Sequence, residues 1–196
     1  MVVLFIVAVA VFIYMVYVLL TVILLVLLSG LYPLVIAGIG KFTPGHGDGE
    51  TVMYKGRVVG YANIGQKFTK DQYFWSRPSA ANYQADASAG SNKGPSNPDY
   101  LKDVKKRIDT FLVHNPTVKP AEIPAELVTA SGSGLDPDLS PAGAKVQTAR
   151  IAKVRNLPAS QINKIIDDNT EGPLFGLFGP TRVNVLKLNV ALDEMK

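Results

Sequence analysis

The first forty residues of the chain, from Met1 to Gly40, contain no charged side chain. Most of them are Val, Leu and Ile, and the only proline is Pro33. The hydrocarbon core of a bilayer is about 30 Å thick, and a helix needs about 20 apolar residues to cross it, because its backbone must satisfy its own hydrogen bonds there. The stretch is about twice that long. We therefore predict a membrane segment over residues 1–40.

The length of this segment has to be reconciled with the thickness of a bilayer. A straight helix of this length would measure about 60 Å, so it cannot lie wholly within the hydrocarbon. No charged or turn-rich stretch divides it into two halves. We therefore predict one span, over about residues 12–36.

Two residues in the second half of the span, Gly30 and Pro33, predict a contact with another helix. Pro33 has no N–H and is expected to bend the helix and leave a carbonyl unpaired, which membranes tolerate mainly where a neighbour covers the kink. Gly30 lies among other small residues that allow close helix approach, namely Thr21, Ser29 and Ala37. A lipid anchor without such a partner is the alternative.

A cleaved signal peptide is the main alternative to this anchor. Signal peptides have a basic start and an apolar core of about 7–15 residues. This segment has no basic residue at its start and a much longer core, and the chain has no cysteine for a lipoprotein anchor. An uncleaved anchor is favoured. The few basic residues after it, Lys41, Lys55 and Arg57, would by charge alone keep the following domain in the cytoplasm.

The rest of the chain has the composition of one globular domain. All 20 Lys and Arg and all 16 Asp and Glu follow Gly40. A Gly- and Pro-rich juxtamembrane linker is predicted over residues 41–50, and about 150 residues suffice for one domain with its own core, predicted over 51–196. The net charge of +4 is mild, and no nucleic-acid partner is predicted.

Local patterns in the domain predict both helices and short strands. Two antiparallel strands joined at Gly56 are expected within residues 51–64. Asn97 and Pro98 begin one helix, and Ser140 and Pro141 begin another of about fifteen residues ending near Asn156. A short strand is expected at the start of 127–137, a helix over 158–168, and over 182–192 a bulged strand or a strand that gives way to a helical turn. The predicted fold class is therefore α+β: a single N-terminal transmembrane helix followed by one soluble mixed α/β domain.

The segment 66–97 has no regular pattern but is too rich in aromatic residues for typical disorder. An ordered Ω-like loop that presents its side chains to a partner is predicted. The residues expected to bind the partner are Tyr73, Phe74, Trp75 and Arg77.

A Gly/Ser loop, Ser131, Gly132, Ser133 and Gly134, precedes the predicted helix at Pro141. Free N–H groups before a helix can bind a phosphate. The loop lacks the Gly-Lys-Ser/Thr of a P-loop, so a structural turn is the favoured interpretation.

The sequence offers little for catalysis. It has two histidines, His46 and His114, no cysteine and no Gly-x-Ser-x-Gly motif. We predict no catalytic residue, no metal site and no cofactor, and a binding or assembly module rather than an enzyme.

Several segments together resemble one family. They are Leu31-Tyr32-Pro33, Ile64-Gly65-Gln66, 73–80, 89–92, 94–97, 126–137, Gln147, 150–152, Arg155 and 183–193. In this order and spacing they are similar to the C subunit of the bacterial Kdp potassium-transporting P-type ATPase. Two features depart from that pattern: the very apolar first ten residues, and Trp75-Ser76.

The resemblance implies an accessory subunit of a potassium uptake pump. Its expected partners are a potassium-channel-like subunit, an ATP-hydrolysing P-type ATPase subunit and the lipid bilayer. It also implies a single-pass protein of the bacterial inner membrane with an extracytoplasmic domain, against the weak charge-based orientation.

Two alternatives remain beside this role. One is a catalytic chaperone that raises the ATP affinity of the pump subunit. In that case ATP would be bound through the complex, and Ser131, Gly132, Ser133, Gly134 and Gln147 are the candidate nucleotide-binding residues. The other is a single-pass cell-envelope enzyme, for which His46 and His114 are the best candidates.

Overall fold

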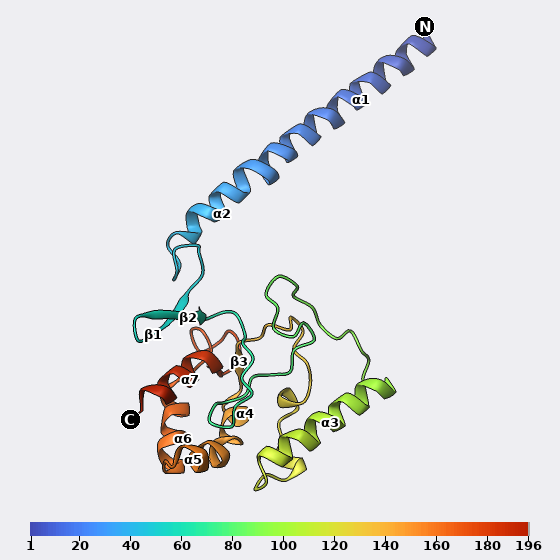
Figure 1. Ribbon diagram of the computed structural model, residues 1–196. Coiled ribbons are helices and arrows are strands. Elements are labelled where there is room, and N and C mark those ends of the chain that lie inside the picture. Colours follow the sequence, from blue (N-terminus) through green and yellow to red (C-terminus); the bar gives the residue numbers. More distant parts are fainter. Residues whose placement is uncertain (196) are drawn as a thin grey trace. The chain divides into compact units, whose positions relative to one another are not determined.

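A computed structural model describes residues 1–195. The chain divides into two compact units, Met1–Glu50 and Thr51–Lys196. The first contains one long helical run. The second contains α-helices, 3-10 turns and short strands, and it ends with a helix (Figure 1).

The first unit consists of α1 (Val2–Leu25), a π-helical turn η1 (Val26–Leu31) and α2 (Tyr32–Gly40), which follow one another without a break. Nearly every side chain in this run is exposed. Together they form one helix that is long and apolar enough to cross a membrane. The predicted single N-terminal helix is confirmed, and its exact limits in the bilayer stay a prediction.

The π-helical turn lies immediately before Pro33. Proline has no N–H, and its ring clashes with the carbonyl four residues earlier, which here belongs to Ser29. The turn widens instead, so that the N–H of Tyr32 bonds to the carbonyl of Leu27, five residues back. The Ser29 hydroxyl donates to the carbonyl of Leu25. The disturbance of hydrogen bonding expected at Pro33 is therefore present, as a π-helical turn.

The second unit begins with a β-hairpin of β1 (Thr51–Tyr54) and β2 (Arg57–Tyr61). The strands pair antiparallel, with Tyr54 opposite Arg57. The two turn residues have positive φ, 50° at Lys55 and 76° at Gly56, as a tight hairpin turn requires. The predicted hairpin is confirmed.

A three-stranded antiparallel sheet has the order β3-β5-β4, with β3 at Asp138–Leu139, β4 at Thr170–Glu171 and β5 at Arg182–Asn184. Helix α7 (Val185–Glu194) follows β5 directly. The Asn184 side chain caps this helix by accepting a hydrogen bond from the N–H of Lys187 at 3.0 Å. Of the two alternatives for 182–192, the strand that gives way to a helix is confirmed.

Four more α-helices complete the unit. They are α3 (Pro98–His114), α4 (Pro141–Lys145), α5 (Thr148–Arg155) and α6 (Ala159–Asp168). Asn97 caps α3 through bonds from the N–H groups of Asp99 and Tyr100, as its sequence predicts. The predicted single helix of about fifteen residues is wrong. Helix α4 ends at Lys145, the Gln147 N–H bonds to the Ala144 carbonyl only three residues back, and α5 begins at Thr148.

The predicted strand at the start of 127–137 is also wrong. Two 3-10 turns, η2 (Pro120–Glu122) and η3 (Ala125–Leu127), precede this region, and η3 includes its first residue. The Thr129 N–H and hydroxyl both bond to the carbonyl of Ala125, at 2.9 and 2.8 Å, so the backbone turns back on itself instead of extending. The Gly/Ser loop that follows is present.

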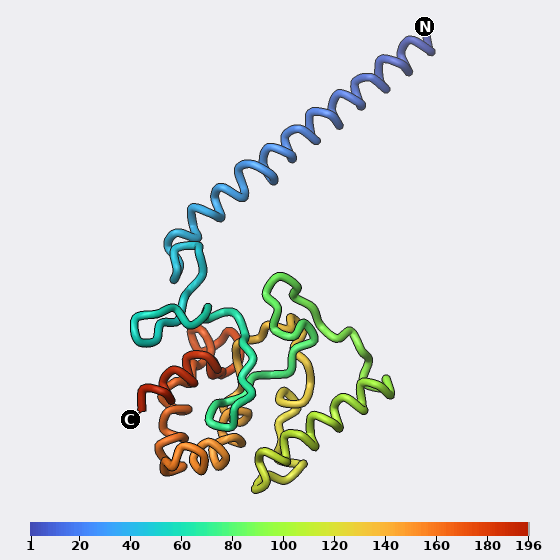
Figure 2. The backbone as a smooth tube through the Cα atoms, viewed as in Figure 1, coloured from blue at the N-terminus to red at the C-terminus, as the bar shows by residue number. Residues whose placement is uncertain are grey.

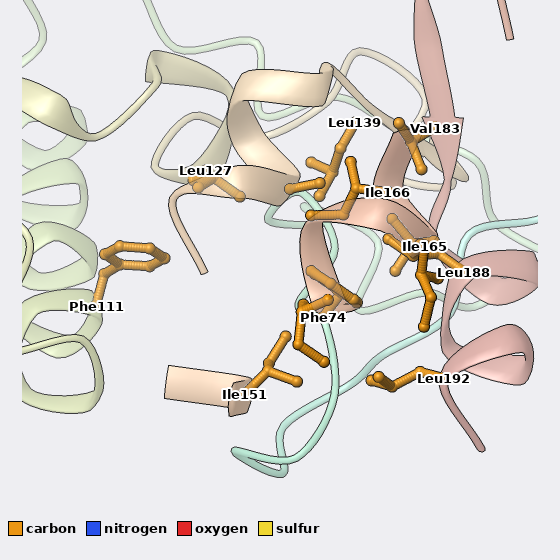
Figure 3. Packing of buried hydrophobic residues seen from close by; sticks show 13 residues of the cluster. Phe74, Phe111, Leu127, Leu139, Ile151, Ile165, Ile166, Val183, Leu188 and Leu192 are labelled. Atoms are coloured by element: carbon orange, nitrogen blue, oxygen red, sulfur yellow. The ribbon is translucent and has the colours of Figure 1, made fainter. Parts of the chain in front are cut away.

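The core lies between these helices and the irregular segment 66–97, whose path is traced in Figure 2. Phe74 belongs to that segment but has 0% exposure and packs in the same cluster as residues from α5, α6 and α7 (Figure 3). The buried members of the cluster are Phe74, Phe111, Leu127, Leu139, Ala144, Ile151, Ile162, Ile165, Ile166, Val183, Val185, Leu188 and Leu192. An irregular segment thus supplies a central core residue.

Candidate functional site

The site is organised around residues 73–77, which lie in no helix or strand. Two buried amide side chains bracket its backbone. Asn189 of α7 accepts from the Phe74 N–H at 2.8 Å and donates to the Phe74 carbonyl at 3.0 Å. Gln147 does the same for Trp75, at 2.9 and 3.2 Å. These side chains take the place of a neighbouring strand and satisfy a buried backbone.

Arg150 of α5 is buried behind the same segment. Its guanidinium donates to the Gln147 amide oxygen at 2.7 Å, to the Asn115 amide oxygen at 3.1 Å and to the backbone carbonyls of Asp71 and Tyr73. Burial lowers the pKa of Arg150 to about 10, partly opposed by the charge of Asp71. All four acceptors are neutral, and the Asp71 carboxylate acts on Arg150 only through its charge, so the cation fixes the loop rather than forming an ion pair.

Tyr73 is held at the other side of the segment. Its hydroxyl donates to the carboxylate of Asp193 at 2.9 Å, and the same carboxylate pairs with Arg155 at 2.6 Å. The Arg155 guanidinium also lies 5.2 Å from the Tyr73 ring centre. The side chain of Tyr73 is half-buried by these contacts.

Trp75 faces an open groove of about 610 Å³ between the irregular segment and α3. The Trp75 ring lies 4.6 Å from the Arg150 guanidinium and 4.8 Å from the His114 ring. His114 in turn contacts the Asp71 carboxylate at 2.7 Å. The groove is lined by Lys67, Phe68, Thr69, Trp75, Ser76, Pro78, Ser79, Asn82, Tyr83, Asp103, Lys106, Arg107, Thr110, Phe111, His114 and Leu127.

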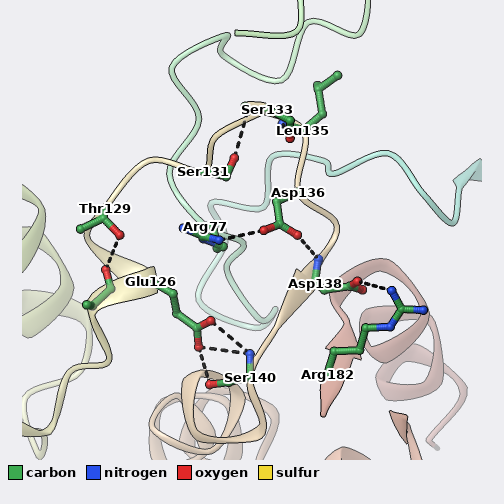
Figure 4. A network of polar contacts seen from close by, with 12 residues as sticks. Arg77, Glu126, Thr129, Ser131, Ser133, Leu135, Asp136, Asp138, Ser140 and Arg182 are labelled. Atoms are coloured by element: carbon green, nitrogen blue, oxygen red, sulfur yellow. Dashed lines mark hydrogen bonds and ion pairs between the residues drawn. The ribbon is translucent and has the colours of Figure 1, made fainter. Parts of the chain in front are cut away.

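Arg77 belongs to a polar network that includes Asp136 and Asp138 (Figure 4). Its guanidinium pairs with Asp136 at 2.9 Å, while its buried Nε has no hydrogen-bond partner within residues 1–195. Its carbonyl accepts from the hydroxyl of Tyr83. Burial raises the pKa of Tyr83 to about 12, so this phenol stays protonated and donating at neutral pH.

The Gly/Ser loop is packed against the irregular segment. The Ser131 N–H bonds to the Pro78 carbonyl at 3.0 Å, and the Ser131 hydroxyl accepts from the Gly134 N–H at 3.0 Å. Ser133 accepts from Ala89 through its carbonyl at 2.9 Å. Gly132 and Ser133 are exposed, whereas Ser131 and Gly134 are buried.

Of the predicted nucleotide-binding residues, Gln147 is not hydrogen-bonded to the loop 131–134. Gln147 bonds to Trp75, Gly143 and Arg150, and the loop 131–134 bonds to residues 78–89. Of this set, none lines the groove. Their role in binding ATP stays a prediction.

Four residues were predicted to bind a partner through the irregular segment, and the structure separates them. Phe74 lies in the core, so its ring cannot meet a partner, because it supplies the apolar centre that the surrounding helices need. Tyr73, Trp75 and Arg77 are partly exposed. In the anchor, Gly30 has no atom within 4 Å of the position a Cβ would take, and it lies in η1 beside Pro33.

Sequence reasoning missed the residues of α3 that line the groove, notably Lys106, Arg107 and Phe111. It also missed Asn189, although an amide among the apolar residues of a helix is a signal for a buried polar bracket. No group of three or more His, Asp and Glu side chains that could hold a metal occurs in the described part of the chain.

These features define a class of protein: an α+β domain joined to one apolar helix, in which buried polar side chains hydrogen-bond to the backbone of an aromatic loop. The family described as K+-transporting ATPase, c chain (KdpC), matches residues 14–194. Because this match covers most of the sequence, the chain belongs to the KdpC family. The resemblance drawn from the sequence is confirmed.

Relatives in several bacteria carry the name potassium-transporting ATPase KdpC subunit. The protein of Flavobacterium johnsoniae is 54% identical over 177 residues, covering 90% of this chain and 95% of its own. That of Bacteroides fragilis is 53% identical over 155 residues, covering 78% and 81%. That of Bacillus cereus is 47% identical over 173 residues, covering 87% and 90%. Together with the long apolar helix, this family fits a single-pass membrane protein.

Proposed function

We propose that the chain is a non-catalytic accessory subunit that stabilises the assembly of a potassium-channel-like subunit with an ATP-hydrolysing subunit, with its domain on the extracytoplasmic side of the inner membrane. The observation that carries this proposal is that the buried polar side chains around Trp75 hydrogen-bond to the protein's own backbone. The backbone of residues 73–75 is bonded by the side chains of Gln147, Arg150 and Asn189. These bonds stiffen the loop, and they occupy the polar groups that a reaction would need. Membership of the KdpC family supports the pump as its setting.

The anchor supplies one contact in this proposal. Side chains of η1 and α2 are exposed along their length, and Gly30 leaves room for a second helix to approach. The π-helical turn rotates the side chains of α2 relative to those of α1. A partner that contacts both helices therefore needs a surface shaped to this rotation. The channel-like subunit is proposed to cover this turn.

The domain supplies the second contact, through the partly exposed aromatic residues of the irregular segment. Trp75 and Tyr73 are aromatic, partly exposed and rigidly held, and such residues lose little entropy on binding. Arg77 is tied to Asp136, so it contributes to the rigidity of the same loop.

Co-purification tests this proposal. The tagged full chain is expressed with the other pump subunits, extracted in mild detergent and isolated, and the co-eluting chains are identified by mass spectrometry. We expect a multi-span potassium-channel-like protein and a P-type ATPase in fixed ratio with the chain. Isolation of the chain alone, under conditions where other membrane complexes survive, would refute the assembly role.

A nucleotide-binding regulator is the second candidate, and the groove favours it. Lys67, Lys106 and Arg107 place positive charge around Trp75, whose ring offers a face for a base. The test is saturable ATP binding by the full chain in detergent, compared between wild type, Gly132→Ala and Lys106→Ala. Loss in Gly132→Ala alone would favour the loop 131–134, and loss in Lys106→Ala alone would favour the groove. No saturable binding would remove this candidate.

A further inference from the structure

The connection between β4 and β5, residues 172–181, presents four large apolar side chains to solvent. Leu174 is 63% exposed, Phe175 84%, Leu177 80% and Phe178 65%. The ten residues Gly-Pro-Leu-Phe-Gly-Leu-Phe-Gly-Pro-Thr contain no charge. We call them the 172–181 loop. A contiguous exposed cluster of this kind marks a contact surface, since isolated apolar residues on a surface need no explanation but groups of them do.

The 172–181 loop has a defined hairpin geometry. Leu174 and Phe178 pair antiparallel, with N–H to carbonyl distances of 2.8 and 3.0 Å in the two directions. The N–H of Gly176 bonds to the Pro173 carbonyl at 2.9 Å, and that of Leu177 to the Leu174 carbonyl at 3.1 Å. At the tip, Phe175 has φ 54°. This left-handed backbone conformation is unfavourable for an aromatic residue, and glycine or asparagine would adopt it more easily. Because the Phe175 ring lies in solvent, it adds nothing to the packing of the domain.

The base of the loop is polar and firmly attached. Arg182 pairs with Glu171 at 3.1 Å and with Asp138 at 3.2 Å, directly below the apolar residues in the strand pairing. The next residue, Val183, is fully buried in the core. The apolar tip therefore stands on an ion-paired base that adjoins a buried core residue.

We propose that the 172–181 loop inserts into the interface of the lipid bilayer that holds the chain's own anchor. Six of the ten residues have no free N–H group, because four N–H groups bond within the loop and two residues are prolines, and this favours lipid over a protein surface. Lipid chains offer no hydrogen-bond partners, so an inserted segment must satisfy its own N–H groups. The N–H groups of Leu174, Gly176, Leu177 and Phe178 are bonded within the loop, and its two prolines have none.

The tether makes the bilayer available to this loop. The linker 41–50 spans at most about 35 Å when extended. A domain of the length of Thr51–Lys196 has a radius of gyration of about 15 Å. The linker thus keeps the domain near the membrane that holds the anchor, at the high local concentration that a tether provides. This inference does not depend on the proposed accessory role.

The absence of cysteine from the natural chain allows a clean test. Phe175→Cys in the full chain is labelled with an environment-sensitive NBD fluorophore and reconstituted, without other pump subunits, into vesicles of phosphatidylethanolamine and phosphatidylglycerol. The matched control is Lys105→Cys, on the exposed face of α3. We expect blue-shifted emission and strong quenching by spin-labelled lipid at position 175, and quenching by aqueous iodide at position 105.

A second variant separates insertion from a general effect of the label. Adding Leu177→Asp to Phe175→Cys should return the label at 175 to water, because a charge at the tip opposes insertion, while the emission of Trp75 stays that of the folded domain. Iodide quenching at 175 as strong as at 105 would overturn the proposal. So would protection of position 175 that develops only after purified pump subunits are added, since the loop would then bind protein.

Discussion

The side-chain amide of Gln147 brackets the backbone of Trp75, accepting from its N–H at 2.9 Å and donating to its carbonyl at 3.2 Å. The two residues are 72 positions apart in sequence. The same amide oxygen accepts from the buried guanidinium of Arg150 at 2.7 Å. One fully buried side chain therefore fixes both an irregular loop and a buried cation.

Gln147→Leu should destabilise the domain strongly. Leucine matches the size of glutamine but leaves the N–H and carbonyl of Trp75 and one Arg150 donor without their partner. Each buried unsatisfied group costs about 1–3 kcal/mol, so we expect a loss of about 2–5 kcal/mol. The measurement is chemical unfolding of the full chain in detergent, followed by the emission of Trp75, the single tryptophan in the chain.

Gln161→Leu is the matched control for this experiment. Gln161 is exposed on α6, and its substitution should change stability by no more than about 0.5 kcal/mol. If both variants unfold at the same denaturant concentration as wild type, the bracket around Trp75 has no role in holding the loop.

Tyr83 predicts a loss of stability at high pH. Its pKa is raised by burial from 10.0 to about 12, so between these values the folded state keeps a proton that the unfolded state has released. Stability from this group is therefore complete below pH 10 and falls as the pH rises toward 12. Arg150, whose pKa is lowered to about 10, acts in the opposite direction over this range.

Comparison with Tyr83→Phe isolates the contribution of this phenol. At neutral pH the variant should be less stable by about 0.5–1.5 kcal/mol, because it loses the hydrogen bond to the Arg77 carbonyl. The difference should shrink between pH 10 and 12, since Arg150 is common to both proteins. A difference that stays constant across that range, measured by urea unfolding, would show that Tyr83 titrates normally.

Two glycines of the Gly/Ser loop should respond differently to alanine. Gly134 has φ +71°, and a Cβ there would lie 2.8 Å from both the Ala81 Cβ and the Ala89 carbonyl oxygen. We expect Gly134→Ala to cost about 1–3 kcal/mol. At Gly132 a Cβ meets nothing within 4 Å, so Gly132→Ala should be tolerated within about 1 kcal/mol. Unfolding midpoints of the two variants make the comparison, and equal midpoints would contradict it.

Features set by neighbouring residues could be predicted from the sequence. Asn97 and Pro98 start α3 because a cap and a preset φ act within one turn, and Lys55-Gly56 closes a hairpin for a similar local reason. The apolar segment 1–40 predicts its helix through composition alone.

The site could be predicted only in part, because its geometry depends on distant contacts. Trp75 was singled out, but the residues that fix it, Gln147 and Arg150, lie more than seventy positions away. Phe74 has no periodic neighbours to reveal that it is buried, since the segment around it is neither helix nor strand. The turn at residues 146–147 likewise interrupts the helical pattern of 141–156, at the residue whose side chain bonds to the distant Trp75.

Pro33→Ala tests the proposed role of the anchor. Alanine restores an N–H that can donate to the Ser29 carbonyl, so the π-helical turn should close into a regular helix. Removing the extra residue from that turn rotates the face after position 33 by about 100° relative to the face before it. If a helix of the channel-like subunit packs on both faces, the mismatch should lower recovery of the pump subunits by about five- to thirty-fold, as a loss of about 1–2 kcal/mol implies.

The control for this variant is Pro44→Ala in the linker, which should co-purify like wild type. Trp75 emission should be unchanged in both variants, because neither alters the domain. Undiminished recovery with Pro33→Ala would mean that the turn faces lipid, and the domain would then have to supply the contact with the pump. Lower recovery with both prolines replaced would instead point to expression or insertion of the chain, which quantifying the membrane-bound protein distinguishes.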